Sequence, residues 1–225
     1  MQKDYSGATA MYDAAIVAAS PQADYATYQK AMIAGIKNSA EKIKLLNSVA
    51  TRYPNSTLRQ DINMETALTY IADEKFAEAI PFLNAVIASK EGGLKPRALL
   101  KLGLVYYNMN NNAQALKSYT ELIKTYPQSD EANDAIDIVK NIYVEEGRPD
   151  DYVAFMKQNG RSVSVTEADS LSYNAAFAKY ETGDCTAAIA SLQIISVSIP
   201  TVLLSLMQII CAVNATGKIK ILRMR

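Results

Sequence analysis

Three prolines stand at a fixed interval in this chain: Pro127 follows Pro54 by 73 residues, and Pro200 follows Pro127 by the same 73. The first two lie in similar segments, Thr51–Ser56 (TRYPNS) and Thr125–Ser129 (TYPQS). Repetition at a fixed interval is typical of stacked units, each burying its apolar face against its neighbours. A period of 73 residues is too long for one helical hairpin and fits two hairpins of about 36 residues each. The repeat therefore predicts a solenoid of helix pairs.

Apolar residues recur with helical periodicity, in segments separated by short polar breaks, and no segment predicts a strand. Two breaks are especially clear: the Asn-rich segment 108–112, and the segment Gly147–Pro149, where proline suits the start of the next helix. We expect helices over residues 3–19, 23–36, 39–52, 57–72, 75–88, 95–109, 112–125, 130–146, 149–158, 166–182 and 184–192.

Composition argues against several classes of function. The chain has 23 basic and 23 acidic residues, but the last 34 residues hold four bases and no acid, so the first 191 carry a net charge of −4. A net negative charge over these residues disfavours binding to the negatively charged phosphates of a nucleic acid. Histidine is absent and the two cysteines lack Cys-x-x-Cys spacing, which removes the commonest general base and the commonest metal ligands. We expect no catalysis, no cofactor, no metal and no small-molecule substrate.

The segment that begins near Pro96 carries a recognisable pattern. Its first helix supplies Leu99, Leu102, Gly103 and Tyr106, and its second supplies Ala115, Tyr119, Leu122 and the closing Pro127. This pattern resembles the tetratricopeptide repeat family, with Leu122 in place of a small residue. The resemblance covers residues 3–193 and is strongest over 95–129. It implies an all-α, right-handed superhelical solenoid of antiparallel helix pairs, with about five and a half units over residues 1–193 that start in the middle of a unit.

The resemblance also implies a function and a site. In this family the first helix of each pair lines a concave groove, and its outward positions bind a partner protein or peptide. Those positions are Arg97, Leu104, Tyr107 and Asn108 in the best-matching pair, Asp61, Met64, Leu68 and Ile71 in an earlier pair, and Tyr173, Phe177 and Tyr180 in a later one. Aromatic residues and arginine contribute much of the binding energy at protein interfaces. The alternative for any single aromatic residue is that it packs against the neighbouring hairpin.

Two acidic pairs, Glu145-Glu146 and Asp150-Asp151, raise the question of a carboxylate dyad. They flank an expected exposed turn, where neighbouring charges are ordinarily solvated, so we interpret them as structural. The sequence thus favours a non-catalytic scaffold or adaptor. The Tyr-Pro-x-Ser joints and the Glu-Gly-Arg turn are similar to those of bacterial cell-envelope tetratricopeptide proteins, although a cytoplasmic location stays open.

The tail, residues 194–225, departs from the repeat. Residues 192–213 contain no charge and are followed by four bases. One hypothesis is a membrane anchor, which would make the chain a tail-anchored protein that displays its solenoid at a bilayer. A second is a helix that caps the solenoid. A third is a shift of reading frame, because one set of codons that encodes residues 194–225, given a single extra A after Gln193, reads in the other frame with a Tyr-Pro joint at the position of Pro200. In the third case, the chain is a piece of a longer protein.

Overall fold

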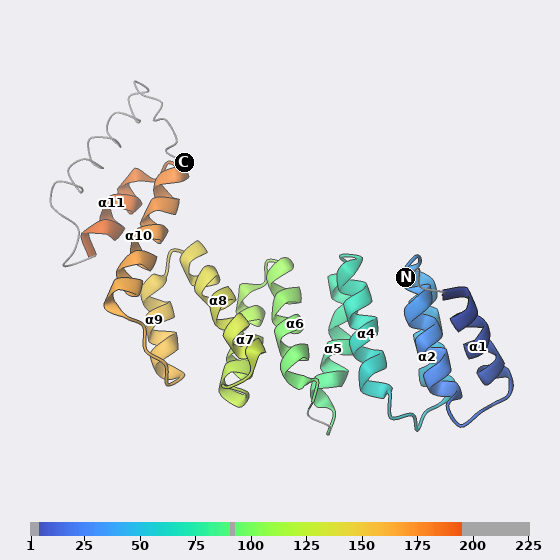
Figure 1. The fold of residues 1–225 in the computed structure, drawn as a ribbon. Helices are drawn as coiled ribbons and strands as arrows, with labels where there is room; N and C mark the ends of the chain where they lie inside the picture. Colours follow the sequence, from blue (N-terminus) through green and yellow to red (C-terminus); the bar gives the residue numbers. More distant parts are fainter. Residues whose placement is uncertain (1–4, 91–92, 195–225) are drawn as a thin grey trace. The chain divides into compact units, whose positions relative to one another are not determined.

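The computed structural model describes residues 5–90 and 93–194, and in these ranges it contains eleven α-helices and no strand (Figure 1). The helices are α1 (Tyr5–Val17), α2 (Ala23–Ala34), α3 (Ser39–Arg52), α4 (Arg59–Ala72), α5 (Phe76–Ala88), α6 (Lys95–Asn108), α7 (Asn112–Thr125), α8 (Asp130–Glu145), α9 (Pro149–Gln158), α10 (Val165–Glu181) and α11 (Cys185–Ile194). The all-α fold of helix pairs is therefore confirmed, and each predicted helix is found with its ends moved by at most two residues.

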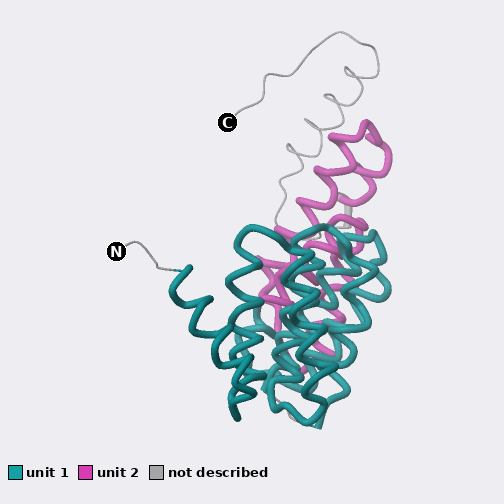
Figure 2. The backbone as a smooth tube through the Cα atoms, turned by 90° about the vertical axis from the view of Figure 1, so that its right-hand side faces the viewer, with its two compact units in different colours: residues 1–133 teal, residues 134–225 magenta. Residues whose placement is uncertain are grey.

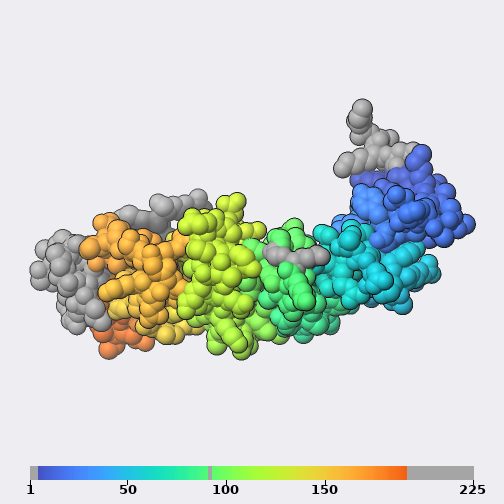
Figure 3. Space-filling view, turned by 90° about the horizontal axis from the view of Figure 1, so that it is seen from below, coloured from blue at the N-terminus to red at the C-terminus, as the bar shows by residue number. Residues whose placement is uncertain are grey.

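The chain divides into two compact units, residues 1–133 and 134–225 (Figure 2). In the first unit, each helix from α1 to α6 contacts the next one along the chain. Figure 3 shows the same succession on the surface, where the cyan to lime colours of α4 to α7 adjoin. In the described part of the second unit, α10 contacts both α9 and α11. Packing between sequence neighbours is what a stack of helical pairs requires.

The turn inside four of the hairpins has one repeated geometry. A residue with positive φ follows the first helix, and the next residue donates its N–H to the carbonyl five residues before it, at 2.8–2.9 Å. The residue with positive φ donates its own N–H to the carbonyl three residues before it. The two hydrogen bonds together form a Schellman motif. The positive-φ residues are Glu74, Asn110, Gly147 and Gly183, with φ of 58°, 57°, 69° and 87°. They recur every 36 or 37 residues, so the half-period inferred from the prolines is confirmed.

The two Tyr-Pro joints also share a conformation. Tyr53 ends α3 with φ −125° and ψ 67°, and Tyr126 ends α7 with φ −128° and ψ 53°. Both residues precede a proline, which disfavours the helical region and so stops the helix. In both joints the serine N–H donates to the tyrosine carbonyl, from Ser56 and from Ser129, at 3.0 Å. The matching phrases in the sequence therefore encode matching turns.

Apolar side chains of successive helices form the core of the first unit. One cluster joins α4, α5 and α6 and is composed of Met64, Ala67, Ala79, Leu83, Val86, Ala98, Leu102 and Val105. A smaller one joins α2, α3 and α4 through Ala31, Leu46, Val49 and Ile62. In the best-matching pair, the expected packing residues Leu99, Leu102, Ala115 and Tyr119 are all buried. Tyr106 is half-buried against the larger cluster.

The three hypotheses for the tail concern residues 195–225, which lie outside the described residues. Within the ranges 5–90 and 93–194, no helix has the length and apolar character needed to cross a membrane. Helix α11 runs through Ile194, and the domain boundary expected between residues 193 and 194 stays a prediction.

Candidate functional site

The outward face of α6 carries the first set of predicted binding residues. Arg97 and Asn108 are exposed, whereas Leu104 and Tyr107 are half-buried. The Asn108 side chain donates from Nδ2 to the carbonyl oxygen of Leu104 at 2.8 Å. The opposite face of the same helix is fully covered, with Ala98, Leu99, Leu102 and Val105 buried. Because α6 has one buried face, the other is left to solvent, as helical periodicity requires.

Helix α10 in the second unit carries a ladder of three aromatic side chains, Tyr173, Phe177 and Tyr180. The rings of Tyr173 and Phe177 stack with centroids 6.2 Å apart and an interplanar angle of 14°. Phe177 and Tyr180 follow at 6.1 Å and 33°. Tyr173 is 38% exposed and Phe177 40% exposed, although aromatic residues of this size are ordinarily covered.

The core of the second unit does not account for this ladder. Leu171, Ala175 and Ala176 form the buried face of α10. The three rings follow a spacing of four and then three residues, which places them along a single helix face. The alternative that these aromatic residues pack inside the hairpin stack therefore does not hold for Tyr173 and Phe177. The ladder is a surface of the second unit, and the α6 set is a surface of the first.

The equivalent positions on α4 are not all at the surface. Met64 is only 2% exposed and belongs to the core cluster of the first unit, so its predicted place in the groove is wrong. The physical reason is that Ala67 and Ala79 of the same cluster are small, and a flexible methionine side chain fills the space beside them. Leu68 and Ile71 are half-buried and pack against this cluster.

An ionic cluster on α2, α3 and α4 was not found from the sequence. Lys42 Nζ lies 2.8 Å from Glu65 Oε2, and these side chains are only 14% and 21% exposed. Burial, with the carboxylates of Glu65 and Asp61 acting in the same direction, raises the pKa of Tyr28 to about 12. These residues come from three helices, so no local motif marks them. Asp61, one of the predicted groove positions, is thus close to Tyr28.

The two acidic pairs near Gly147 have a structural partner. Arg148 binds Glu146 through Nη1 at 3.0 Å and Asp151 through Nε at 2.6 Å, and its guanidinium lies 5.5 Å from the ring centroid of Tyr143. The hydrogen bond to Asp151 is the main cause that raises the pKa of Arg148. An arginine between the carboxylates favours the structural interpretation of this turn. In the part of the chain that the structure describes, no group of acidic or cysteine side chains is placed to hold a metal ion.

The helical pair of α6 and α7 carries the similarity to a known family. Residues 97–129 match the family model of the tetratricopeptide repeat. This pair of helices is therefore similar to one tetratricopeptide repeat. The matched residues contain α7 and nearly all of α6, and end at the Ser129 joint. The tetratricopeptide pattern inferred from Leu99 to Pro127 is thereby confirmed.

Two solved tetratricopeptide repeat structures are similar to this chain. One is the C-terminal part of a repeat protein from Cytophaga hutchinsonii, with 15% identity over 84% of this chain and 72% of that one and a TM-score of 0.47. The other is a tetratricopeptide repeat protein from Parabacteroides merdae, with 13% identity over 91% of each chain and a TM-score of 0.47. Comparison with curated proteins gives no match.

Proposed function

We propose that this protein is a non-catalytic scaffold or adaptor that binds a protein or peptide partner on the outward faces of its first helices. The aromatic ladder of Tyr173, Phe177 and Tyr180 on α10 carries the proposal. The α6 set, Arg97, Leu104, Tyr107 and Asn108, supplies further contacts from the first unit. The proposal includes no nucleic acid, no cofactor and no small-molecule substrate.

The ladder supports protein binding because of its energetics. Aromatic rings bring large contact areas and lose little side-chain entropy when they are covered, which is why tyrosine is enriched at binding hot spots. The rings already stack on one another in the unbound protein. They therefore lose less conformational entropy when a partner binds. An apolar strip on the rigid face of a helix suits an extended segment or another helix laid along it.

The test replaces the ladder and compares partner sets. We would prepare the chain with Tyr173→Ala, Phe177→Ala and Tyr180→Ala together, and capture partners from the source organism with both forms. We expect the triple variant to capture at least tenfold less of the proteins that the unchanged chain captures. Its helical circular dichroism spectrum should equal that of the unchanged chain. Retention of the same partners by a folded variant would overturn the role of the ladder.

A matched control removes exposed apolar side chains elsewhere. Met11 and Val17 on α1 are 77% and 86% exposed, so Met11→Ala with Val17→Ala lowers surface hydrophobicity without touching α6 or α10. This control is expected to capture the same partners as the unchanged chain. If it loses them equally, capture depends on nonspecific hydrophobic contact, and the proposed site fails.

We also propose that the protein works at the bacterial cell envelope. The Tyr-Pro-x-Ser joints at Tyr53 and Tyr126 and the Glu-Gly-Arg turn at 146–148 support this location. Fractionation of source cells with an antibody against the chain tests it. Recovery with the envelope or periplasmic fraction is expected, and recovery in the cytosol contradicts the proposal.

A further inference from the structure

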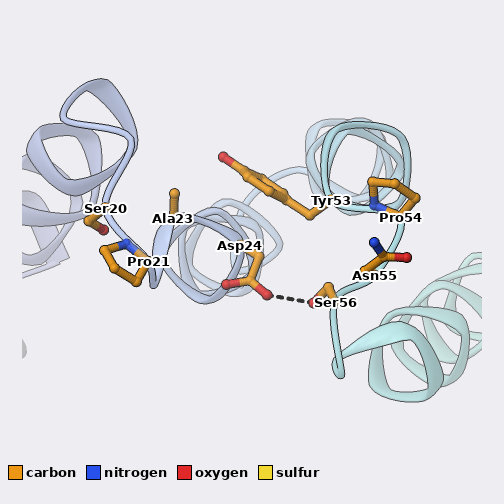
Figure 4. Close-up of a pocket in the computed structure, with 8 residues that line it drawn as sticks. All are labelled: Ser20, Pro21, Ala23, Asp24, Tyr53, Pro54, Asn55 and Ser56. Carbon is orange, nitrogen blue, oxygen red and sulfur yellow. Dashed lines mark hydrogen bonds between the residues drawn. The ribbon is translucent and has the colours of Figure 1, made fainter.

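A pocket lies in the first unit where two chain joints meet (Figure 4). Its volume is about 320 Å³, and it is bordered by the joint between α1 and α2 and by the joint between α3 and α4. The lining residues are Ser20, Pro21, Ala23, Asp24, Tyr53, Pro54, Asn55 and Ser56. This volume lies at the lower end of the range of about 300–1,000 Å³ that ligand pockets span, and it is large enough for one long side chain.

One carboxylate dominates the polar part of the pocket. Asp24 Oδ2 accepts a hydrogen bond from Ser56 Oγ at 2.6 Å, and Oδ1 accepts one from the N–H of Tyr25 at 2.7 Å. The first bond joins α2 to the second joint, 32 residues away, and Figure 4 shows it as the dashed line. Each carboxylate oxygen can accept more than one hydrogen bond, so Asp24 keeps acceptor capacity.

The charge of this carboxylate is not balanced nearby. Among the described residues, no lysine or arginine forms an ion pair with Asp24, and no basic residue lines the pocket. The nearby Arg59 donates from Nη2 to the carbonyl oxygen of Pro54 at 2.8 Å, which stabilises the joint. The pocket thus has a formal charge of −1.

Two further features of the wall suit a planar cation. The side-chain oxygen of Ser20 is buried and has no hydrogen-bond partner among the described residues, so it can accept a bond from a ligand. Tyr53 also lines the pocket, and its ring, drawn above Asp24 in Figure 4, supplies an aromatic surface. Aromatic faces attract cations, and the guanidinium of arginine stacks on them particularly well.

We propose that this pocket binds the guanidinium of an arginine side chain from a partner segment. The guanidinium presents five N–H donors in a fixed plane, which can bond to the remaining acceptor sites of the Asp24 carboxylate, while Ser20 and Tyr53 are further lining groups of the same pocket. The pocket is formed by joints and lies outside the predicted outward positions on α6 and α10. Its occupancy therefore does not depend on the proposed role of the aromatic ladder.

The experiment uses a pair of isosteric probes. We would record amide nitrogen–proton spectra of the full chain during titration with N-acetylarginine amide, and separately with N-acetylcitrulline amide, which is neutral and of the same shape. Arginine is expected to shift the amide signals of residues 20–24 and 53–56, and citrulline to bind at least tenfold more weakly. Equal binding of the two probes, or arginine shifts confined to other segments, overturns the proposal.

Two variants show whether the carboxylate itself is responsible. Asp24→Asn keeps an acceptor for Ser56 while removing the charge, and it is expected to weaken arginine binding at least tenfold with the remaining spectrum unchanged. Glu78→Gln is the control, because Glu78 is also an acid in the first turn of a helix, α5, but lies outside the pocket. Full arginine binding by the Asp24→Asn variant, or equal losses in both variants, overturns the assignment.

Discussion

The ring of Tyr119 on α7 occupies the space that Gly103 on α6 leaves by having no side chain. A Cβ placed on Gly103 would overlap Cε1 of Tyr119 and would lie 2.6 Å from Cζ and 2.7 Å from Cδ1, closer than non-bonded carbons approach. In the preceding pair, 36 residues earlier, Ala67 and Leu83 hold the equivalent positions and are both fully buried. A larger first-helix residue is therefore paired with a smaller second-helix residue.

This pairing predicts that Gly103→Ala destabilises the protein, although alanine is the better helix former. The propensity gain is about 1 kcal/mol, whereas forcing extra volume into a packed interior costs about 1–3 kcal/mol, more when the neighbour is a rigid ring. Adding Tyr119→Leu, which recreates the Ala67–Leu83 pair, should recover part of the loss. The free energy of unfolding from urea titration measures both effects, and additive losses in the double variant would contradict the pairing.

Gly93→Ala is the control for the first prediction. A Cβ at Gly93 has nothing within 4 Å and its φ is not positive, so the substitution is expected to change the free energy of unfolding by less than about 0.5 kcal/mol. If this variant is as unstable as Gly103→Ala, the loss arises from the glycine backbone and not from Tyr119.

The hydroxyl of Tyr119 gives a second prediction. The ring is fully buried, and its oxygen has no hydrogen-bond partner among the described residues. Burying an unpaired hydroxyl costs about 1–3 kcal/mol. Tyr119→Phe is therefore expected to leave the free energy of unfolding unchanged or to raise it by about 1 kcal/mol. A thermal melt of the two forms compares them, and a clear loss of stability would show that the hydroxyl has a partner, such as a buried water.

The repeated hairpin turns give a third prediction. Glu74 adopts φ 58° at a position where Gly147 and Gly183 stand in later hairpins. A left-handed conformation costs an L-residue roughly 1 kcal/mol more than it costs glycine. Glu74→Gly should therefore raise the free energy of unfolding by about 1 kcal/mol, and Gly183→Ala should lower it by a similar amount.

Steric contact does not complicate the substitution at Gly183, because a Cβ there meets nothing within 4 Å. Asn110→Gly is an internal comparison: asparagine tolerates this region better than glutamate, so its gain should be smaller than that of Glu74→Gly. Equal effects at Glu74 and Asn110 would show that the turn conformation is not what limits stability.

These turns and joints were largely predictable because their signals are local. Gly147 and Gly183 end helices by positive φ, and Tyr53 and Tyr126 end them by preceding proline. Such rules need only a few neighbouring residues, so the helix ends and the repeat over residues 97–129 could be inferred from the sequence. Glu74 is the exception, since the break between helices was expected there but glutamate gives no sign of the positive φ that it adopts.

The detailed surface was harder to predict because equivalent positions in the repeat have different neighbours. Met64 and Tyr173 occupy the same register on their helices, yet Met64 is 2% exposed and Tyr173 is 38% exposed. The register shows which face a residue lies on but not whether a neighbouring helix covers it. The bond from Ser56 to Asp24 and the ion pair between Lys42 and Glu65 likewise join residues from different helices or joints.

The cluster around Tyr28 predicts how stability depends on pH. Burial, with smaller contributions from Glu65 and Asp61, raises the pKa of Tyr28 from 10.0 to about 12. Between these values the folded state keeps a proton that the unfolded state releases. The stability that Tyr28 contributes is therefore fully present below pH 10 and is lost as the pH rises toward 12.

Ultraviolet absorbance of tyrosinate in the folded protein measures this titration directly. Tyr28→Phe should remove one group that titrates near pH 12 and should lessen the alkaline loss of stability. Glu65→Gln should move the pKa of Tyr28 downward by less than the whole shift, because burial remains its larger cause. The same substitution takes the ionic partner from Lys42, so it should also lower the free energy of unfolding at neutral pH. A Tyr28→Phe variant with the same alkaline titration curve as the unchanged protein would show that Tyr28 does not titrate near pH 12.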